Sequence, residues 1–192
     1  MIENLIAIGS STGGPRALER VLTSLPSKIN AAIIIAQHMP KGFTASLAQR
    51  LNNICNIRVF EAKEGDIIKN DTAYIAPGGQ HMIVELDKNN NCVIHLFEDK
   101  IKSYYKPSVD ALMESVAALP TKKRIGVILT GMGSDGAKGL KALKQNGGII
   151  IAQDEATCVV FGMPAAAIKE GIVDKVLPLD KIAEEIIRIV EA

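Results

Sequence analysis

The sequence predicts an α/β fold: a doubly wound, mostly parallel sheet with helices on both faces and an antiparallel hairpin insertion at one edge. Three observations lead to this prediction. Short apolar runs without polar alternation indicate strands that are buried on both faces. Amphipathic stretches of helical period separate these runs. In the middle of the chain, residues 57–97 replace this alternation with short strands and turns.

The elements of the expected parallel sheet alternate along the chain. The buried strands are expected at Leu5 to Ile8, Ala31 to Ala36, Ile125 to Leu129 and Gly148 to Ala152. The helices are expected at Pro15 to Leu25, Gly42 to Asn52, Ser108 to Ala118, Asp135 to Gln145 and Asp180 to Glu191. Pro15 and Pro107 stand where a helix begins, and the first turn of a helix tolerates proline. Repeated strand–helix–strand units favour a doubly wound sheet.

The middle of the chain is expected to differ from this pattern. Its strands are expected at Arg58 to Glu61, Ala73 to Ile75, Met82 to Asp87 and Cys92 to Phe97. The last two strands flank Asn89-Asn90-Asn91, and this arrangement predicts a β-hairpin. We therefore expect residues 57–97 to form an antiparallel insertion at one edge of the sheet.

Composition limits the classes of function. With 192 residues, no internal repeat and no evident linker, we expect a single domain over residues 1–192. The net charge of +1 gives no basic patch for nucleic acid and no polybasic segment for anionic membranes. No apolar run approaches the ~20 residues of a membrane helix, and the first residues lack signal-peptide features, so we expect a cytoplasmic protein. The three cysteines and three histidines have no metal-ligand spacing, so we expect no metal and no cofactor.

The loop after the first expected strand contains a candidate nucleophile. Gly9-Ser10-Ser11-Thr12-Gly13 fits G-x-S-x-G between an apolar strand and a helix, which is the context of a nucleophile elbow. The small residues permit a sharp, strained turn, and the helix N-terminus supplies N–H groups for a developing oxyanion. The alternative is a glycine-rich turn that binds a phosphate or no ligand, with Ser11 as an N-cap.

A serine nucleophile needs a base, and His38 is the best candidate among the three histidines. It follows the second expected parallel strand directly, whereas the other two histidines lie within residues 57–97. Because catalytic groups collect at the carboxyl ends of parallel strands, topology brings His38 to the same edge as Ser11. Asp135 and Asp154 also follow parallel strands, and either carboxylate can orient His38. Spacing does not decide between them.

The loop that contains Asp135 also supports a rival function. Residues 131–136 read Gly-Met-Gly-Ser-Asp-Gly, which fits G-x-G-x-x-G, follows a strand and opens a helix. Asp154 and Glu155 stand close to the position of a ribose-binding carboxylate, about 20 residues further on. A dinucleotide-binding domain is therefore the alternative. The unit stands late in the chain, however, and this function gives Ser11 and His38 no role.

Six blocks of the sequence follow one another in order from residue 6 to residue 164. They are IAIGSSTGG at 6–14, QHMPKGFT at 37–44, YIAPGGQHM at 74–82, KPSVD at 106–110, GVILTGMGSDG at 126–136 and AQDEATCVVFGMP at 152–164. Together they resemble the catalytic domain of the chemotaxis protein-glutamate methylesterase family, CheB. The resemblance implies that Ser11, rather than Ser10, is the nucleophile, that His38 is the general base, and that Asp135 orients His38. It also implies that the main-chain N–H of Met132 donates to the oxyanion and that Thr12 lines the site.

The resemblance also implies an activity and a partner. It implies hydrolysis of glutamate γ-methyl esters on methyl-accepting chemotaxis receptors, and deamidation of particular receptor glutamines. The partner is then the cytoplasmic helical bundle of the receptor, with no nucleic acid and no insertion into the membrane. Members of the family usually carry an N-terminal receiver domain that covers the active site. Because this chain begins one strand before Ser11, we expect an enzyme without phosphorylation control.

Overall fold

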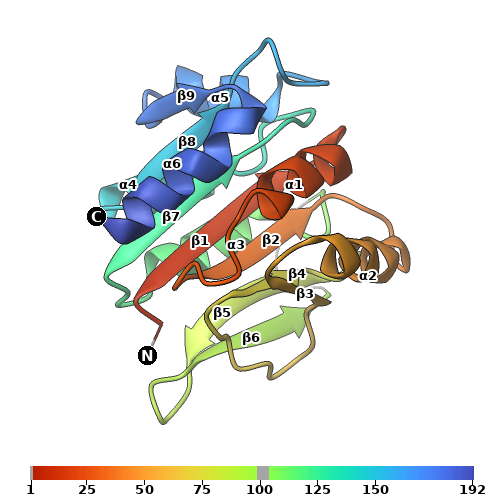
Figure 1. The fold of residues 1–192 in the computed structure, drawn as a ribbon, viewed down its shortest axis with the longest axis vertical. Coiled ribbons are helices and arrows are strands. Elements are labelled where there is room, and N and C mark those ends of the chain that lie inside the picture. Colours follow the sequence, from red (N-terminus) through yellow and green to blue (C-terminus); the bar gives the residue numbers. More distant parts are fainter. Residues whose placement is uncertain (1, 99–103) are drawn as a thin grey trace.

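The protein folds around a seven-stranded sheet, with a separate two-stranded sheet beside it (Figure 1). The structure is a computed structural model that describes residues 2–98 and 104–192. In spatial order the strands of the large sheet are β3 (Arg58–Glu61), β4 (Thr72–Ile75), β2 (Ala32–Gln37), β1 (Asn4–Ser10), β7 (Lys123–Ile128), β8 (Ile149–Gln153) and β9 (Lys175–Leu177). Every neighbouring pair in this sheet is parallel, so the predicted fold class is confirmed.

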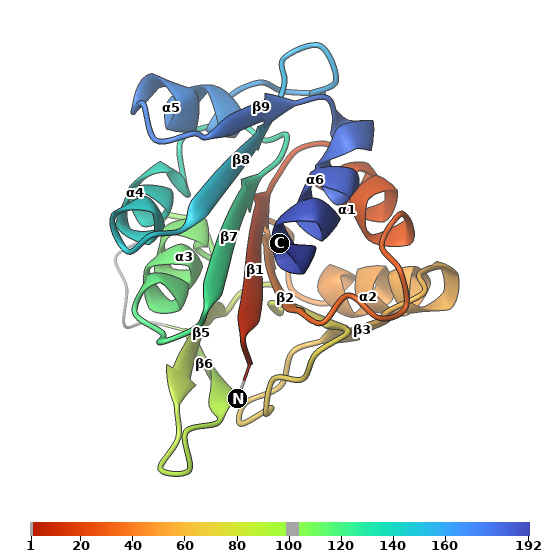
Figure 2. The ribbon, with the colours of Figure 1, turned by 60° about the vertical axis from the view of Figure 1, so that its left-hand side comes forward.

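Helices cover both faces of the large sheet (Figure 2). One face carries α1 (Gly14–Thr23), α2 (Phe43–Ile54) and α6 (Leu179–Glu191), and the other carries α3 (Val109–Ala117), α4 (Ala137–Gln145) and α5 (Met163–Lys169). Strand β1 supplies both cores: Ile6 and Ile8 pack in one, and Leu5 and Ala7 pack in the other. All four side chains are fully buried, which explains why the strand has no polar alternation. Each buried aliphatic side chain of the size of leucine stabilises the fold by about 1.5–3 kcal/mol.

The predicted antiparallel insertion is shorter than expected. Only β5 (His81–Leu86) and β6 (Cys92–Phe97) form the antiparallel hairpin, which packs against α3. The prediction was wrong for β3 and β4, which are parallel members of the large sheet. Parallel neighbours usually need a crossover of a dozen or more residues that contains a helix. Residues 62–71 connect β3 to β4 without any helix, so nothing in the sequence pattern distinguishes these two strands from the antiparallel hairpin that follows them.

Two short elements near the C-terminal end were not predicted. Helix α5 has seven residues and strand β9 has three, and neither is long enough to show a clear hydrophobic period. The other strands and helices match the predicted elements to within two residues at each end. Within the described ranges, no helix is both long enough and apolar enough to cross a membrane.

Candidate active site

The loops that contain Ser11 and His38 leave the large sheet side by side. Strands β1 and β2 are parallel neighbours, with Ser10 paired to Gln37 at their carboxyl ends. The main-chain N–H of His38 donates to the carbonyl oxygen of Ser10 at 3.0 Å. The buried amide of Gln37 donates to the carbonyl oxygens of both Ser11 (3.0 Å) and His38 (2.9 Å). Its Oε1 accepts a hydrogen bond from Ser10 Oγ at 2.6 Å, so Gln37 fixes the two loops to each other.

The turn at Ser11 differs from the expected nucleophile elbow in one respect. We expected strain at the serine, but the left-handed backbone conformation falls on Gly13 (φ 82°), and Ser11 has a negative φ. The turn therefore needs no strain at Ser11, because a glycine adopts the positive φ at little cost. The N–H of Ser11 donates to the carbonyl oxygen of Thr130 at 3.0 Å, which ties the serine to the end of β7.

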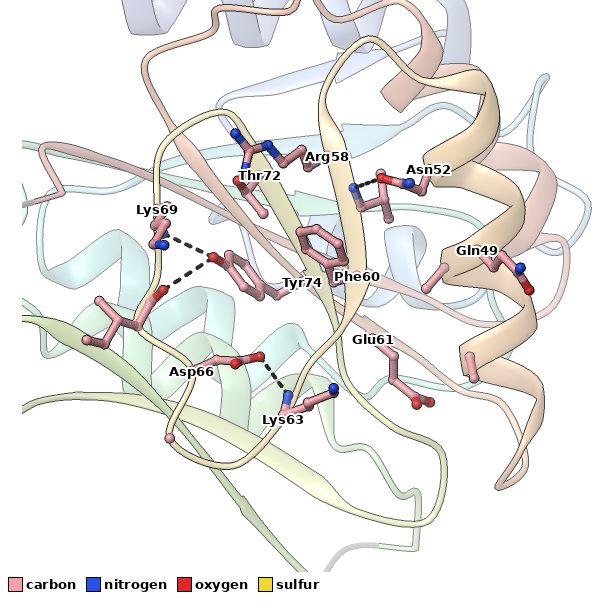
Figure 3. A pocket seen from close by; sticks show the side chains of 15 residues that line it. Gln49, Asn52, Arg58, Phe60, Glu61, Lys63, Asp66, Lys69, Thr72 and Tyr74 are labelled. Atoms are coloured by element: carbon pink, nitrogen blue, oxygen red, sulfur yellow. Dashed lines mark hydrogen bonds between the residues drawn. The ribbon is translucent and has the colours of Figure 1, made fainter.

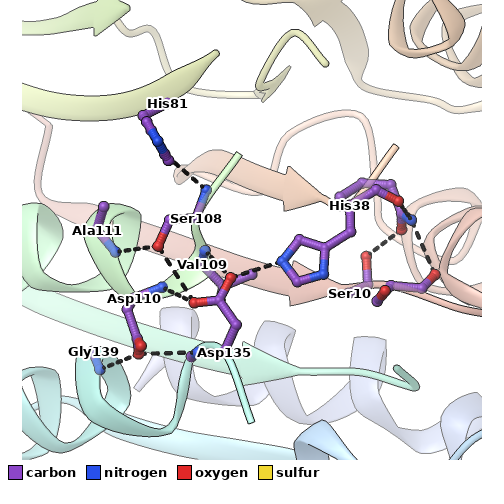
Figure 4. Close-up of polar contacts among 12 residues, drawn as sticks. Ser10, His38, His81, Ser108, Val109, Asp110, Ala111, Asp135 and Gly139 are labelled. Carbon is purple, nitrogen blue, oxygen red and sulfur yellow. Dashed lines mark hydrogen bonds and ion pairs between the residues drawn. The ribbon is translucent and has the colours of Figure 1, made fainter. Parts of the chain in front are cut away.

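The acid beside His38 is Asp135. His38 Nε2 and Asp135 Oδ2 lie 2.7 Å apart, and both side chains are less than one-tenth exposed. Asp154, the other candidate, instead accepts hydrogen bonds from the N–H (3.0 Å) and the hydroxyl (2.6 Å) of Thr157. Figure 4 shows the imidazole between Asp135 on one side and Ser10, the neighbour of Ser11, on the other. The second ring nitrogen, Nδ1, is buried and makes no hydrogen bond within the described residues.

The carboxylate of Asp135 lies at the N-terminus of α3. It accepts hydrogen bonds from the N–H groups of Val109 (2.8 Å) and Asp110 (2.9 Å), and Ser108 Oγ lies 3.4 Å away. Burial alone would raise the pKa of Asp135, but the hydrogen bonds from His38 and from these N–H groups outweigh it. The pKa of Asp135 is therefore held below its ordinary value, and the carboxylate remains ionised beside the imidazole.

Asp110 performs the same task for the neighbouring helix. Its Oδ1 accepts hydrogen bonds from Gly136 (2.9 Å) and Gly139 (2.7 Å), the first N–H groups of α4 (Figure 4). Burial raises the pKa of Asp110. Asp135 thus binds the N-terminus of α3, the helix that contains Asp110, and Asp110 binds the N-terminus of α4, the helix that follows Asp135. Because α3 and α4 hold each other's N-termini, Asp135 cannot move without disturbing both helices.

The glycine-rich loop packs against the Ser11 turn. A Cβ on Gly131 would lie 2.8 Å from Ser11 Cβ and 2.3 Å from Met163 Sδ, so only glycine fits there. Asp135 of the same loop is occupied by His38. The other two glycines of the G-x-G-x-x-G pattern, Gly133 and Gly136, have positive φ angles of 89° and 105°, which glycine adopts at little cost. These features account for the pattern without a dinucleotide. Next to Gly131, Met132 is 62% exposed, and no described residue accepts a hydrogen bond from its N–H. Thr12 is exposed at the start of α1.

A wide groove lies elsewhere on the molecule. It has a volume of about 850 Å³ and lies between α2 and strands β3 and β4, with Phe60, Ile67 and Tyr74 in its wall (Figure 3). It contains none of the residues that approach Ser11 or His38. The groove is therefore separate from the candidate site around Ser11 and His38. In the parts of the chain described here, no group of three His, Cys, Asp or Glu side chains is placed to bind a metal ion.

Comparison with known proteins identifies the family. The family model described as CheB methylesterase matches residues 6–186. The chain belongs to this family. It is 50% identical over 186 residues to a protein-glutamate methylesterase/protein-glutamine glutaminase of Halalkalibacterium halodurans, covering 97% of the chain and 54% of that relative. It is also 50% identical to a protein of the same name from Geobacillus kaustophilus, covering 97% and 53%.

A solved structure of the CheB methylesterase family has the same fold. The crystal structure of the Thermotoga maritima CheB methylesterase catalytic domain superposes with a TM-score of 0.94 at 43% identity. The match covers 98% of this chain and 100% of that domain. The chain spans about half the length of the curated relatives it matches.

Three residues that support the site in this CheB-family chain were not predicted in that role. Gln37 fixes the two loops, as described above. Thr130 Oγ1 donates to the carbonyl oxygen of Thr12 at 2.9 Å and so holds the turn after Ser11. Tyr105 stacks on the ring of His38. Gln37 and Thr130 end or follow parallel strands, so the rule for carboxyl ends could have found them. No sequence pattern singles out Tyr105.

Proposed function

We propose that this chain is a protein-glutamate methylesterase, a serine hydrolase that acts in the cytoplasm on methyl-accepting chemotaxis receptors. The observation that carries the proposal is the position of His38: its Nε2 is 2.7 Å from Asp135, and its other nitrogen is buried without a partner beside the Ser11 loop. We further propose that residues 1–192 form one catalytic domain. The names of the relatives support the reaction, since they include both a methylesterase and a glutaminase.

Asp135 would set the tautomer of His38. An ionised carboxylate accepts hydrogen bonds only, so the proton of a neutral imidazole belongs on Nε2 and the lone pair on Nδ1. Nδ1 then takes the proton of Ser11 as its Oγ attacks the carbonyl carbon of the ester. In the free chain no hydrogen bond joins Ser11 to His38. Such contacts commonly form only when the substrate is bound.

The developing oxyanion would be bound by main-chain N–H groups. The N–H of Met132 is the proposed donor, and it has no competing acceptor among the described residues. Thr12 would line the site from the start of α1, where the helix dipole favours negative charge. A single donor of this kind contributes about 10²–10³ to the rate.

The remaining steps follow from the same groups. When the tetrahedral intermediate collapses, the C–O bond to the methoxy group breaks, and the proton on His38 passes to the leaving oxygen to give methanol. Water then attacks the acyl-enzyme with His38 again as base, which releases the glutamate carboxylate and restores Ser11. With a glutamine substrate the leaving group is ammonia. No step requires a metal ion or a cofactor.

Covalent labelling tests the nucleophile. The chain is incubated with a fluorophosphonate, and the modified peptide is identified by mass spectrometry. We expect one adduct on Ser11, no adduct in Ser11→Ala, and labelling that is slowed at least about 100-fold in His38→Gln. Ser10→Ala is the matched control and should label at Ser11. An adduct on Ser10, or labelling that does not depend on His38, would contradict the proposed mechanism.

A further inference from the structure

The ring of Tyr105 lies flat against the imidazole of His38. The two ring centroids are 4.3 Å apart, and the angle between the ring planes is 6°. The His38–Asp135 hydrogen bond holds one edge of the imidazole at Nε2. A single hydrogen bond fixes that edge but leaves the plane of the ring free to tilt about it. The stacked tyrosine lies against the face of the imidazole, where it opposes this tilt.

Tyr105 also reaches the loop that carries Met132. Its Oη lies 3.3 Å from the position that a Cβ would occupy on Gly133, the residue after Met132. Three residues further along the chain, Ser108 caps α3, the helix whose N-terminus binds Asp135. The tyrosine therefore contacts the base directly, contacts the glycine-rich loop, and is joined through a short segment to the helix that holds the acid.

We propose that Tyr105 is a positioning residue for His38, which rests on the proposed function above. The stacked ring holds the imidazole plane so that Nδ1 stays turned toward Ser11. Its electron-rich face also attracts the imidazolium cation that forms when His38 takes the proton of Ser11. The ring rather than the hydroxyl supplies both effects. Phenylalanine should therefore replace Tyr105, and an aliphatic side chain should not.

Tyr104 provides a matched control. It is 94% exposed and makes a T-shaped contact with the Tyr105 ring, with centroids 5.2 Å apart and an interplanar angle of 84°. No stacking contact joins it to His38. The same substitution at the two adjacent tyrosines thus separates a contact with the base from a general effect of removing an aromatic ring.

The experiment compares Tyr105→Phe, Tyr105→Leu and Tyr104→Leu by methanol release from methylated receptor membranes. We expect Tyr105→Leu to lower kcat about 10- to 100-fold with KM within about twofold, because the base is misplaced while the binding surface remains. Tyr105→Phe and Tyr104→Leu should stay within about threefold of wild type. Proton NMR gives a readout without substrate: the low-field signal of His38 Nε2–H should persist in Tyr105→Phe and broaden in Tyr105→Leu.

Several outcomes overturn the proposal. A wild-type kcat in Tyr105→Leu would show that catalysis does not require the stacked ring. Equal losses of kcat in Tyr105→Phe and Tyr105→Leu would assign the effect to the hydroxyl. If neither wild type nor any variant releases methanol, the proposed function fails, and the NMR signal alone tests the role of Tyr105. An unchanged His38 Nε2–H signal in Tyr105→Leu then overturns the positioning role. If circular dichroism shows that the Leu variant is unfolded, Tyr105→His restores a planar ring, and a loss of kcat above tenfold there overturns the proposal.

Discussion

Replacing Asp135 by asparagine should separate the catalytic contribution of this carboxylate from its structural one. The two carboxylate oxygens accept hydrogen bonds from His38 Nε2 and from the N–H groups of Val109 and Asp110. Asparagine offers one oxygen, and its NH₂ group then faces either a main-chain N–H or the imidazole. When the NH₂ group faces Nε2, it donates to that nitrogen, so the ring proton moves to Nδ1. The base then has no lone pair toward Ser11.

The loss of kcat in Asp135→Asn should be much larger than its loss of folding stability. Forcing the wrong tautomer in a serine triad costs about 10⁴ in kcat, so we expect a fall of about 10³–10⁴, equivalent to about 4–5.5 kcal/mol. One main-chain N–H left without an acceptor at the start of α3 costs about 1–3 kcal/mol in the free energy of unfolding. For a chain of this length, that lowers Tm by about 2–12 °C. The variant should therefore be folded at assay temperature and almost inactive.

Acid unfolding checks the electrostatic part of this reasoning. Because the pKa of Asp135 is lowered in the folded protein, its charge stabilises the fold above the unfolded pKa of about 3.9. That stabilisation is lost as the pH falls through the folded pKa. The difference in unfolding free energy between wild type and Asp135→Asn, measured by urea denaturation, should therefore shrink below about pH 4.

Asp154→Asn is the matched control for the rate, since this acid also follows a parallel strand but its carboxylate binds Thr157 of its own loop. It should keep the wild-type kcat. If Asp135→Asn retains kcat within tenfold of wild type, or if Asp154→Asn loses as much as Asp135→Asn, the assignment of Asp135 is refuted.

Three further changes test the surroundings of the site. Asp110→Ala removes the cap of α4 and should lower the free energy of unfolding, measured by urea denaturation, by about 1–2 kcal/mol. Asp110→Asn keeps the oxygen that accepts these hydrogen bonds and loses the buried charge, so its stability should match wild type. Equal losses of stability in the two variants would contradict this role of Asp110. Ser10→Ala leaves the buried Oε1 of Gln37 without its donor and should cost about 1–3 kcal/mol of stability while Ser11 still labels; loss of labelling would contradict the role of Ser10. Gly131→Ala pushes a methyl group against Ser11 and should slow fluorophosphonate labelling at least about tenfold with unchanged circular dichroism; wild-type labelling would show that the loop relaxes freely.

The sequence predicted the parallel sheet because burial on both faces leaves a direct trace in it. Ile33, Ile34 and Ile35 are consecutive apolar residues whose side chains alternate between the two cores. Strand β4 has the same trace, since Ala73 and Ile75 belong to one core and Tyr74 to the other. The pairing direction of β3 and β4 was nevertheless not predictable, because each strand is four residues long and the connection between them contains no helix.

The site was predictable as far as topology alone places residues. Ser11 and His38 follow neighbouring parallel strands, and any structure of that topology brings them to one edge. The choice between Asp135 and Asp154 depends on where α3 begins, because its N-terminus binds the carboxylate that faces His38. The stack of Tyr105 on His38 depends on the path of a loop with no periodic pattern. Residue spacing carries no information about either contact.

The most direct test of the central claim is methanol release from receptor membranes that carry labelled methyl esters. Wild type is compared with Ser11→Ala and Ser10→Ala at equal concentration. We predict that wild type and Ser10→Ala release labelled methanol, that Ser11→Ala does not, and that the receptor gains free glutamate carboxylates at the demethylated positions. Release that persists in Ser11→Ala, or its absence from a folded wild-type protein that still labels at Ser11, would contradict the claim that this chain is a methylesterase acting through Ser11.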